Sequence, residues 1–308
     1  MRRFLLIVLS AVFLGGVGFW ILTSPALFHA VRGRAVTLPD AFQADAGRGE
    51  RLFWSGGCAS CHKSEPSENN MLLGGGHELK TPFGIFVVPN ISAHPRDGIG
   101  GWRFEDFALA MREGVLPDGS HAFPAFPYTA YQRMSVTDLA DLFAFLQTVP
   151  AVEGRQAPHA LAFPFNIRRG LGLWKWLYLD GAEFVEDSSQ SALWNQGAYL
   201  VNGAGHCAEC HSPHTVLGGL SPDKRFAGGR MPDGGAGRVP NLTPHQDGLG
   251  SWSLEDIEEF LKTGFTPSFD SAGGSMAEVI KNMGHLSGED RKAIALYLKS
   301  LKPLPKAP

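Results

Sequence analysis

Hydrophobic and polar residues follow each other along this chain in a pattern that predicts one long apolar segment and then a series of short helices. Two arginines precede an uncharged run from Phe4 to Leu22, which is almost entirely apolar. This run exceeds a signal-peptide core of about 7 to 15 residues and nearly matches the ~20 that span a bilayer. We therefore expect residues 1–26 to form a retained membrane anchor, with a cleaved signal as the alternative. The positive-inside rule then keeps the arginines cytoplasmic and exports the rest of the chain.

Three helix signals occur twice in the exported part. A Ser-x-x-Asp capping pattern that ends at Asp138, and again at Asp290, introduces the third helix of each set. Gly114 and Gly264 follow the second helix of each set, as expected of C-terminal caps. Strand signals are sparse, and only residues 85–88 resemble a short strand. The six expected helices span residues 45–55, 102–113, 139–149, 191–202, 252–263 and 293–301.

The repeated helix signals belong to an internal sequence repeat. Residues 90–102 (NISAHPRDGIGGW) return as residues 241–252 (NLTPHQDGLGSW), one residue shorter. Self-similarity of this length indicates two copies of one domain. We expect a first repeat at residues 40–150, a linker at 151–189 and a second repeat at 190–302.

All four cysteines of the chain lie in two Cys-x-x-Cys-His motifs, one in each repeat. Two thiols at this spacing can add to the vinyl groups of one haem, and the adjacent histidine then becomes the proximal iron ligand. Structural zinc needs four ligands, whereas each motif offers three. A thioredoxin-like redox pair would need neither the histidine nor a second copy. The sequence therefore predicts two covalently bound haem c groups, held by Cys58, Cys61 and His62 and by Cys207, Cys210 and His211.

Composition limits the other classes of function. The chain has 308 residues, a net charge of −3 and 44% hydrophobic residues, enough for about two domains with cores of their own. It has no long basic run and no basic stretch with interleaved aromatic residues, which argues against nucleic-acid binding. With every cysteine assigned to a haem motif, disulfides are not expected. Together with the anchor, these features predict a protein on the periplasmic side of a bacterial inner membrane.

Three helices around each haem motif resemble the plan of a small class I cytochrome c domain. The expected fold is therefore all-α, with two tandem class I cytochrome c domains after an N-terminal transmembrane helix. The first and last helices of such a domain cross closely, and a glycine on one helix admits an aromatic residue from the other. We expect Gly49 to face Phe145 and Gly197 to face Tyr297.

Several further motifs resemble the membrane-bound cytochrome c subunits of periplasmic dehydrogenases, such as those for alcohol and gluconate. These motifs are residues 81–84 (TPFG), 90–92 (NIS), 97–102 (DGIGGW), 111–114 (MREG) and 124–128 (PAFPY). Residues 163–168 in the linker more closely resemble subunits that serve molybdenum hydroxylases of the isoquinoline and nicotinate type. Many alcohol dehydrogenase subunits carry three haem motifs, whereas this chain has two. The resemblance implies electron transfer from a dehydrogenase catalytic subunit to a terminal oxidase, a quinone or another cytochrome.

The sixth iron ligand is expected to differ between the repeats. Met276 follows His211 by 65 residues and lies in a glycine-serine loop before the last helix. A His/Met haem there would have a raised reduction potential, and Met283 is the alternative thioether. The equivalent position in the first repeat is Phe126, which cannot bind iron.

Three outcomes are open for the first haem: His121 binds its iron, Met134 binds it, or the iron stays five-coordinate. We rank His121 first, because a neutral imidazole is a strong ligand and the preceding Asp-Gly-Ser gives its loop freedom. Met134 lies just before a helix cap, where an apolar packing residue is expected in any case. Imidazole ligation would lower the potential of the first haem relative to the second.

Two interpretations of function follow, and they differ in whether the iron of the first haem has an open sixth position. The favoured one is an electron carrier, because both repeats resemble the carrier family and the anchor fits it. The alternative is a di-haem peroxidase with an open first haem, which only Phe126 favours.

Several aromatic residues are also candidates for functional roles. Trp102 and Trp252 are expected either to line the haem pockets or to pack as ordinary core residues. Trp174, Trp176 and Tyr178 in the linker are expected to pack between the domains. A docking surface for a partner subunit or for the membrane is the alternative.

Overall fold

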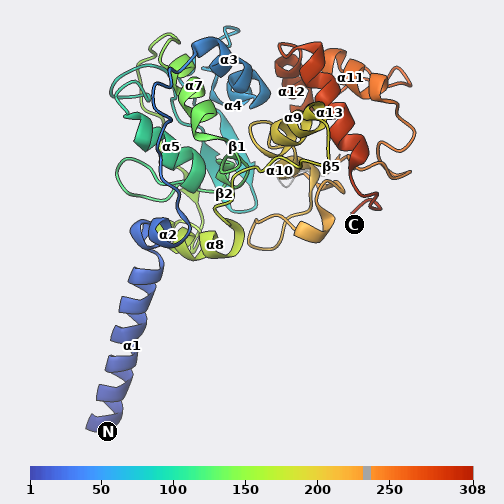
Figure 1. Ribbon diagram of the computed structural model, residues 1–308. Helices are drawn as coiled ribbons and strands as arrows, with labels where there is room; N and C mark the ends of the chain where they lie inside the picture. Colours follow the sequence, from blue (N-terminus) through green and yellow to red (C-terminus); the bar gives the residue numbers. More distant parts are fainter. Residues whose placement is uncertain (232–236, 308) are drawn as a thin grey trace.

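The computed structural model describes residues 1–231 and 237–307 and shows a long helix, α1 (Arg2–Leu22), attached to a body of short helices (Figure 1). None of the residues of α1 is buried. Of the helices in the described ranges, α1 alone is long and apolar enough to cross a membrane. The next helix, α2 (Pro25–Arg32), begins at a proline. Proline lacks a backbone N–H, and in the first turn of a helix this N–H would have no partner within the helix in any case. Helix α2 lies at the base of the body.

Most elements of the body are helical, as expected, but small sheets occur as well. The first repeat contains α3 (Ala46–Ser55), α4 (Cys58–His62), β1 (Glu78–Thr81), β2 (Gly84–Val87), α5 (Phe104–Glu113), α6 (Tyr128–Tyr131) and α7 (Val136–Leu146). The linker contains β3 (Ala160–Leu161), a 3-10 turn η1 (Arg168–Gly170) and α8 (Leu171–Tyr178). The second repeat contains α9 (Ala192–Asn202), α10 (Ala208–His211), η2 (Pro222–Lys224), β4 (Gly229–Arg230), β5 (Arg238–Val239), α11 (Leu254–Thr263), α12 (Ser275–Met283) and α13 (Gly288–Ser300).

The strands modify the expected all-α architecture. Strand β2 covers most of the expected strand at residues 85–88 and pairs antiparallel with β1 on one side and with β3 on the other. The linker thus adds a strand to a hairpin of the first repeat. Strands β4 and β5 form a second, two-stranded sheet.

The expected helix caps are present. The Ser135 side chain accepts a hydrogen bond from the backbone N–H of Asp138 at the start of α7, at 3.1 Å. At the start of α13, the side chain of Ser287 does the same for Asp290, at 3.0 Å. Glycines with φ of 59° and 81°, in the left-handed region that favours glycine, follow α5 and α11. These local signals therefore placed the helix ends well.

The first and last helices of each repeat cross closely, as expected. A Cβ atom added to Gly49 of α3 would overlap the Asp141 carbonyl oxygen and lie 2.9 Å from the Phe145 Cβ atom of α7, which confirms the first expected contact. In the second repeat, a Cβ atom on Gly197 would overlap the carbonyl oxygen of Ala293. The closest partner there is thus one helical turn before the expected Tyr297.

The two repeats are joined by reciprocal contacts between their capped helices and their first helices. Asp138 at the start of α7 accepts a hydrogen bond from the Tyr199 hydroxyl of α9. Its equivalent Asp290, at the start of α13, accepts hydrogen bonds from Arg51 of α3, one of them from Nε at 3.0 Å. One apolar cluster also runs through both repeats, with fully buried residues from each. The two repeats therefore share a core and an interface.

The helix crossing in the first repeat predicts a sharp difference between two glycines of α3. Replacing Gly49→Ala should lower the free energy of unfolding by about 1–3 kcal/mol, because the added methyl group overlaps the α7 backbone. Gly47→Ala is the matched control on the exposed side of the same helix, and it should change stability by less than ~1 kcal/mol, in the favourable direction. Denaturant unfolding of both variants measures this; equal effects would contradict the close crossing.

The ion pair between Arg51 and Asp290 predicts a stability difference that depends on pH. Burial alone would raise the Asp290 pKa, but hydrogen bonds from Arg51, Ser287 and Gln196 outweigh it and hold the pKa below its usual value. The ionised carboxylate therefore stabilises the fold at neutral pH, and this contribution is lost as pH falls through the lowered pKa. Arg51→Met should cost about 2 kcal/mol at neutral pH, because it leaves a buried carboxylate without its cation.

The matched control for this prediction is Arg103→Met, since Arg103 pairs with Asp106 on the surface with 73% of its side chain exposed. That change should cost no more than about 0.5 kcal/mol. The difference between wild type and Arg51→Met should shrink in acid, as measured by denaturant unfolding at several pH values. A loss for Arg51→Met no larger than for Arg103→Met would show that the interface pair contributes little.

Candidate haem sites

Each Cys-x-x-Cys-His motif forms about one turn of helix, directly after the first helix of its repeat. The first motif is α4 and the second overlaps α10. The chain enters α4 through Gly57 at φ 58°, a left-handed conformation that a glycine adopts without strain. Burial raises the pKa of Cys58 and of Cys207 to about 12. Thiols with a raised pKa are weak nucleophiles at neutral pH.

The histidine of each motif is oriented by the same backbone contact. His62 donates from Nδ1 to the carbonyl oxygen of Pro89 at 2.8 Å, and His211 donates from Nδ1 to that of Pro240, also at 2.8 Å. Because Nδ1 carries the proton, Nε2 has its lone pair available for a metal. Burial lowers the pKa of His62 to about 4 and also lowers that of His211, so both rings are neutral. The residues therefore fit two proximal haem ligands.

The repeated asparagine motif explains how these prolines are held. Asn90 follows Pro89, and its side-chain Nδ2 donates to the Val152 carbonyl oxygen at 2.7 Å, after the last helix of the first repeat. Asn241 follows Pro240 and donates in the same way to Leu304 at 2.7 Å, after the last helix of the second. Each proline loop is thereby fastened to the end of its own repeat.

Trp102 and Trp252 lie just before α5 and α11, and both are half-buried against the apolar cluster. Within the described part of the chain, neither indole N–H has a hydrogen-bond acceptor. The indoles of Trp54, Trp174, Trp176 and Trp194 all donate to protein atoms. Whether these two equivalent indoles line haem pockets or pack as ordinary core residues stays a prediction.

The residues expected on the two distal sides lie in different surroundings. Met276 lies half-buried in the first turn of α12, and Met283, 4% exposed, ends the same helix. The segment expected as a loop before the last helix is thus helical from Ser275. In the first repeat, Phe126 packs against Tyr131 with 5.5 Å between ring centroids, and Tyr131 lies close enough to both thiols of the first motif to interact electrostatically.

In the structure, both ring nitrogens of His121, the expected ligand of the first iron, are bonded to protein groups. Its ring is 2% exposed; Nε2 donates to the Thr23 carbonyl oxygen at 2.9 Å, and Nδ1 accepts from Lys175 Nζ at 2.8 Å. Burial, with Lys175 nearby, lowers the pKa of His121 to about 4, so this imidazole is neutral and has both nitrogens engaged. Repeat spacing alone does not reveal this, because the two partners come from the anchor and the linker. Met134 is fully buried in the shared apolar cluster.

Each haem motif also contacts the other repeat. Ser60, inside the first motif, accepts a hydrogen bond from Asn282 of α12 at 2.8 Å. Glu209, at the matching position of the second motif, accepts one from Thr129 of α6 at 2.6 Å. The reciprocal interface therefore extends to the haem motifs themselves.

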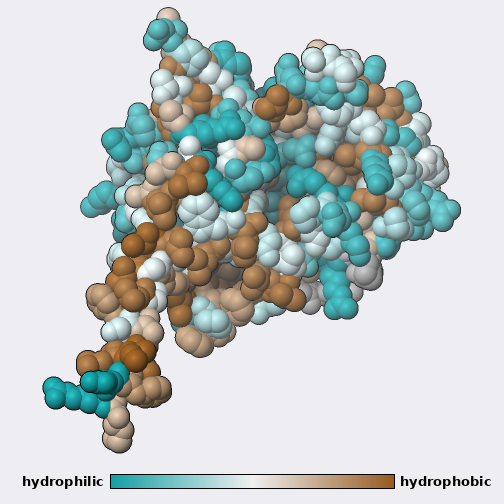
Figure 2. All heavy atoms as spheres, turned by 60° about the horizontal axis from the view of Figure 1, so that its bottom comes forward, coloured by the Kyte–Doolittle hydropathy of each residue, from teal (hydrophilic) through white to brown (hydrophobic). Residues whose placement is uncertain are grey.

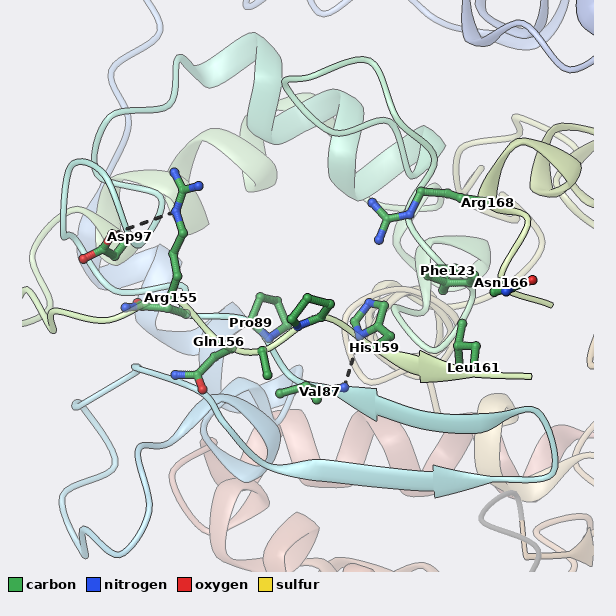
Figure 3. Close-up of a pocket in the computed structure, with 13 residues that line it drawn as sticks. Val87, Pro89, Asp97, Phe123, Arg155, Gln156, His159, Leu161, Asn166 and Arg168 are labelled. Carbon is green, nitrogen blue, oxygen red and sulfur yellow. Dashed lines mark hydrogen bonds and ion pairs between the residues drawn. The ribbon is translucent and has the colours of Figure 1, made fainter. Parts of the chain in front are cut away.

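A cavity of about 360 Å³ lies beside Pro89, whose carbonyl oxygen orients His62. Arg155 and Arg168 stand on opposite sides of it, with His159 between them (Figure 3). Both guanidinium groups already have protein partners there, because Arg155 pairs with Asp97 at 3.9 Å and Arg168 lies 5.0 Å from the centroid of the Phe123 ring. Sequence patterns do not reveal this site, because its residues come from the linker and from three separate loops.

These two motif-bearing halves define a protein of the cytochrome c family, and the cytochrome c family profile matches residues 46–150 and 195–302. The chain belongs to this family. It is 45% identical over 306 residues to a diheme cytochrome c-type protein of Cereibacter sphaeroides, which covers 97% of this chain and 98% of the relative.

Other relatives are components of dehydrogenases. A nicotinate dehydrogenase component of Pseudomonas putida is 37% identical over 260 residues, or 84% of this chain and 22% of the relative. The fructose dehydrogenase cytochrome subunit of Gluconobacter japonicus is 36% identical over 269 residues, or 86% of this chain and 54% of the relative. The chain thus spans only part of these two proteins. The resemblance to cytochrome subunits of dehydrogenases is confirmed, and nothing in these relatives supports the peroxidase alternative.

The hydrogen bonds of His121 predict that its removal leaves the first haem unchanged. His121→Ala should keep the electron paramagnetic resonance spectrum of the oxidised protein, because neither ring nitrogen is available to iron. Met134→Leu is the comparison variant, since it removes the other candidate ligand at nearly constant volume. A new high-spin signal in His121→Ala alone would show that the histidine does bind the first iron.

Proposed function

We propose that this chain is a membrane-anchored, di-haem electron-transfer subunit that receives electrons from a periplasmic dehydrogenase catalytic subunit. The observation that carries the proposal is the matched pair of motif histidines, each with Nδ1 bonded to a proline carbonyl oxygen at 2.8 Å. Two equivalent, neutral imidazoles, each directly after a pair of cysteines, suit two haems of the c type. Names of the dehydrogenase relatives support the partner class.

The domain organisation belongs to this proposal. Two tandem class I cytochrome c domains, at residues 40–150 and 190–302, are joined by the linker at 151–189. Each domain holds one covalently attached haem through its two cysteines, and its histidine is the proximal ligand. A haem supplies one-electron redox chemistry at its iron, while the protein binds it, excludes water and sets its potential.

The distal sides give the two haems different properties. We assign Met276 as the sixth ligand of the second haem, which raises its potential. For the first haem we no longer propose His121, which leaves Met134 or an open position. We expect the two potentials to differ, because Phe126 takes the place that Met276 holds in the second repeat and the surroundings of the two irons are therefore not alike.

The location follows from the anchor and from the chemistry of haem attachment. Helix α1 fixes the chain in the inner membrane with its two N-terminal arginines in the cytoplasm, and the haem domains stand on the periplasmic side. Electrons then leave toward a terminal oxidase, a quinone or another cytochrome in or on the same membrane.

Redox titration of the full chain in detergent tests this assignment. We expect two covalently bound haems per chain and two separate reduction steps. Met276→Leu should lower the potential of one haem only, because a thioether ligand stabilises ferrous iron. Met283→Leu is the matched control on the same helix and should change neither potential.

The outcome also discriminates carrier from enzyme. A carrier isolated with its dehydrogenase should be reduced at both haems when the substrate of that dehydrogenase is added, and should not consume hydrogen peroxide. One haem per chain, two identical potentials, or rapid peroxide turnover would each contradict the proposal.

A further inference from the structure

The C-terminal end of α1 is fastened tightly to the linker. Arg169 donates to the Trp20 carbonyl oxygen at 2.8 Å and to the Thr23 side chain at 2.9 Å, and its guanidinium lies 3.9 Å from the Trp20 ring centroid. Trp176 donates to the Leu22 carbonyl oxygen at 2.8 Å. These donors satisfy carbonyl groups that have no partner within the helix, and the positive charge suits a helix C-terminus. The body therefore has a fixed orientation relative to α1.

Close backbone packing strengthens this junction. A Cβ atom added to Gly172 of α8 would lie 2.5 Å from the Cα atom of Thr23, so the linker helix touches the chain directly after α1. The 21 residues of α1 have a length of about 31 Å, which matches the ~30 Å hydrocarbon core of a bilayer. Since α1 ends at this junction, the junction lies at the level of the lipid headgroups.

Exposed apolar side chains gather at the same level and form what we call the basal patch. It consists of Phe163, Phe165, Leu173, Leu177, Val216 and Leu217, which are 79%, 41%, 41%, 66%, 92% and 49% exposed. Figure 1 places α8 beside α2, directly above α1, and Figure 2 shows apolar side chains continuing from α1 onto the underside of the body. Soluble surfaces seldom gather so many large apolar side chains in one place without a binding role.

Contacts connect the patch across the linker and both repeats. Phe165 packs against Phe83 with ring centroids 4.8 Å apart, and Phe83 lies next to Gly218. The neighbouring Leu217 carbonyl oxygen accepts a hydrogen bond from the Trp174 indole at 2.9 Å. The patch is therefore one continuous, structured surface.

Charge at the rim of the patch favours a lipid surface. Arg168 and Arg169 flank the patch, and neither forms a salt bridge with a carboxylate among residues 1–231 and 237–307. Arginines around exposed apolar and aromatic side chains are typical of segments that lie at the boundary between headgroups and acyl chains. Basic side chains there are attracted to anionic lipids.

We propose that the basal patch rests in the headgroup region of the bilayer as a second membrane contact beside α1. This inference rests on the proposed membrane anchoring and goes beyond it, because it fixes how the haem domains face the membrane. If α1 were the sole membrane contact, the body would be tethered to the membrane but free to tilt. With the patch inserted, the first repeat and the loop of the second repeat at Val216 both stand on the lipid surface.

Photo-crosslinking of the full chain in nanodiscs of phosphatidylethanolamine and phosphatidylglycerol tests this. A photoreactive benzoylphenylalanine replaces Phe163 or Leu177, one position per protein, and lipid adducts are quantified by mass spectrometry. Phe13 in α1 is the anchor control. Phe269, 89% exposed in the loop between α11 and α12 of the second repeat, is the matched exposed control. Each variant is first checked for an unchanged haem spectrum.

We expect adducts at positions 13, 163 and 177, several-fold above those at position 269. If lipid adducts form at position 13 but are no more abundant at positions 163 and 177 than at position 269, the proposed membrane contact of the basal patch is wrong. The membrane anchoring by α1 would still hold. A lack of adducts at position 13 would overturn the anchoring on which the inference rests. In native membranes, crosslinks from positions 163 and 177 to a protein subunit instead of lipid would also overturn it.

Discussion

The reciprocal contact between the two repeats is the constraint on which the rest of the structure depends. The first turn of each last helix carries an aspartate whose carboxylate bonds to the first helix of the other repeat, Asp138 to Tyr199 and Asp290 to Arg51. Local capping and domain association thus use the same two residues. Because the first helix of each repeat leads directly into a haem motif, the interface also holds the two motifs next to the partner repeat.

Within this frame, the proximal sides of the two sites are alike and the distal sides are not. The hydrogen bond from each motif histidine to a proline carbonyl oxygen is repeated with the same length, and each proline loop is held by an equivalent asparagine. Replacement of methionine by Phe126 on one distal side leaves the duplicated frame intact. Duplication of the fold would therefore allow the two proposed redox centres to be tuned separately.

Local signals made much of this predictable from the sequence. The haem motifs, the apolar run of α1 and the glycine caps at Gly114 and Gly264 each depend on neighbouring residues alone, and the structure places these elements where they were expected. Contacts between distant segments were not predictable. His121 looked like a loop ligand, yet its partners Thr23 and Lys175 lie 98 and 54 residues away, on the anchor and the linker. The pairing of the linker strand with the first repeat was also not predictable, because it too joins segments that are distant in the sequence.

Because Asn282 bonds to Ser60 and Thr129 bonds to Glu209, each haem motif is held against the other repeat, and we propose that the two haems exchange electrons within one molecule. Rapid mixing with less than one reducing equivalent per chain, followed by absorbance at the haem bands, tests it most directly. We expect electrons to redistribute from the low-potential to the high-potential haem at a rate independent of protein concentration. A redistribution rate that rises in proportion to concentration would show transfer only between molecules and would contradict the account.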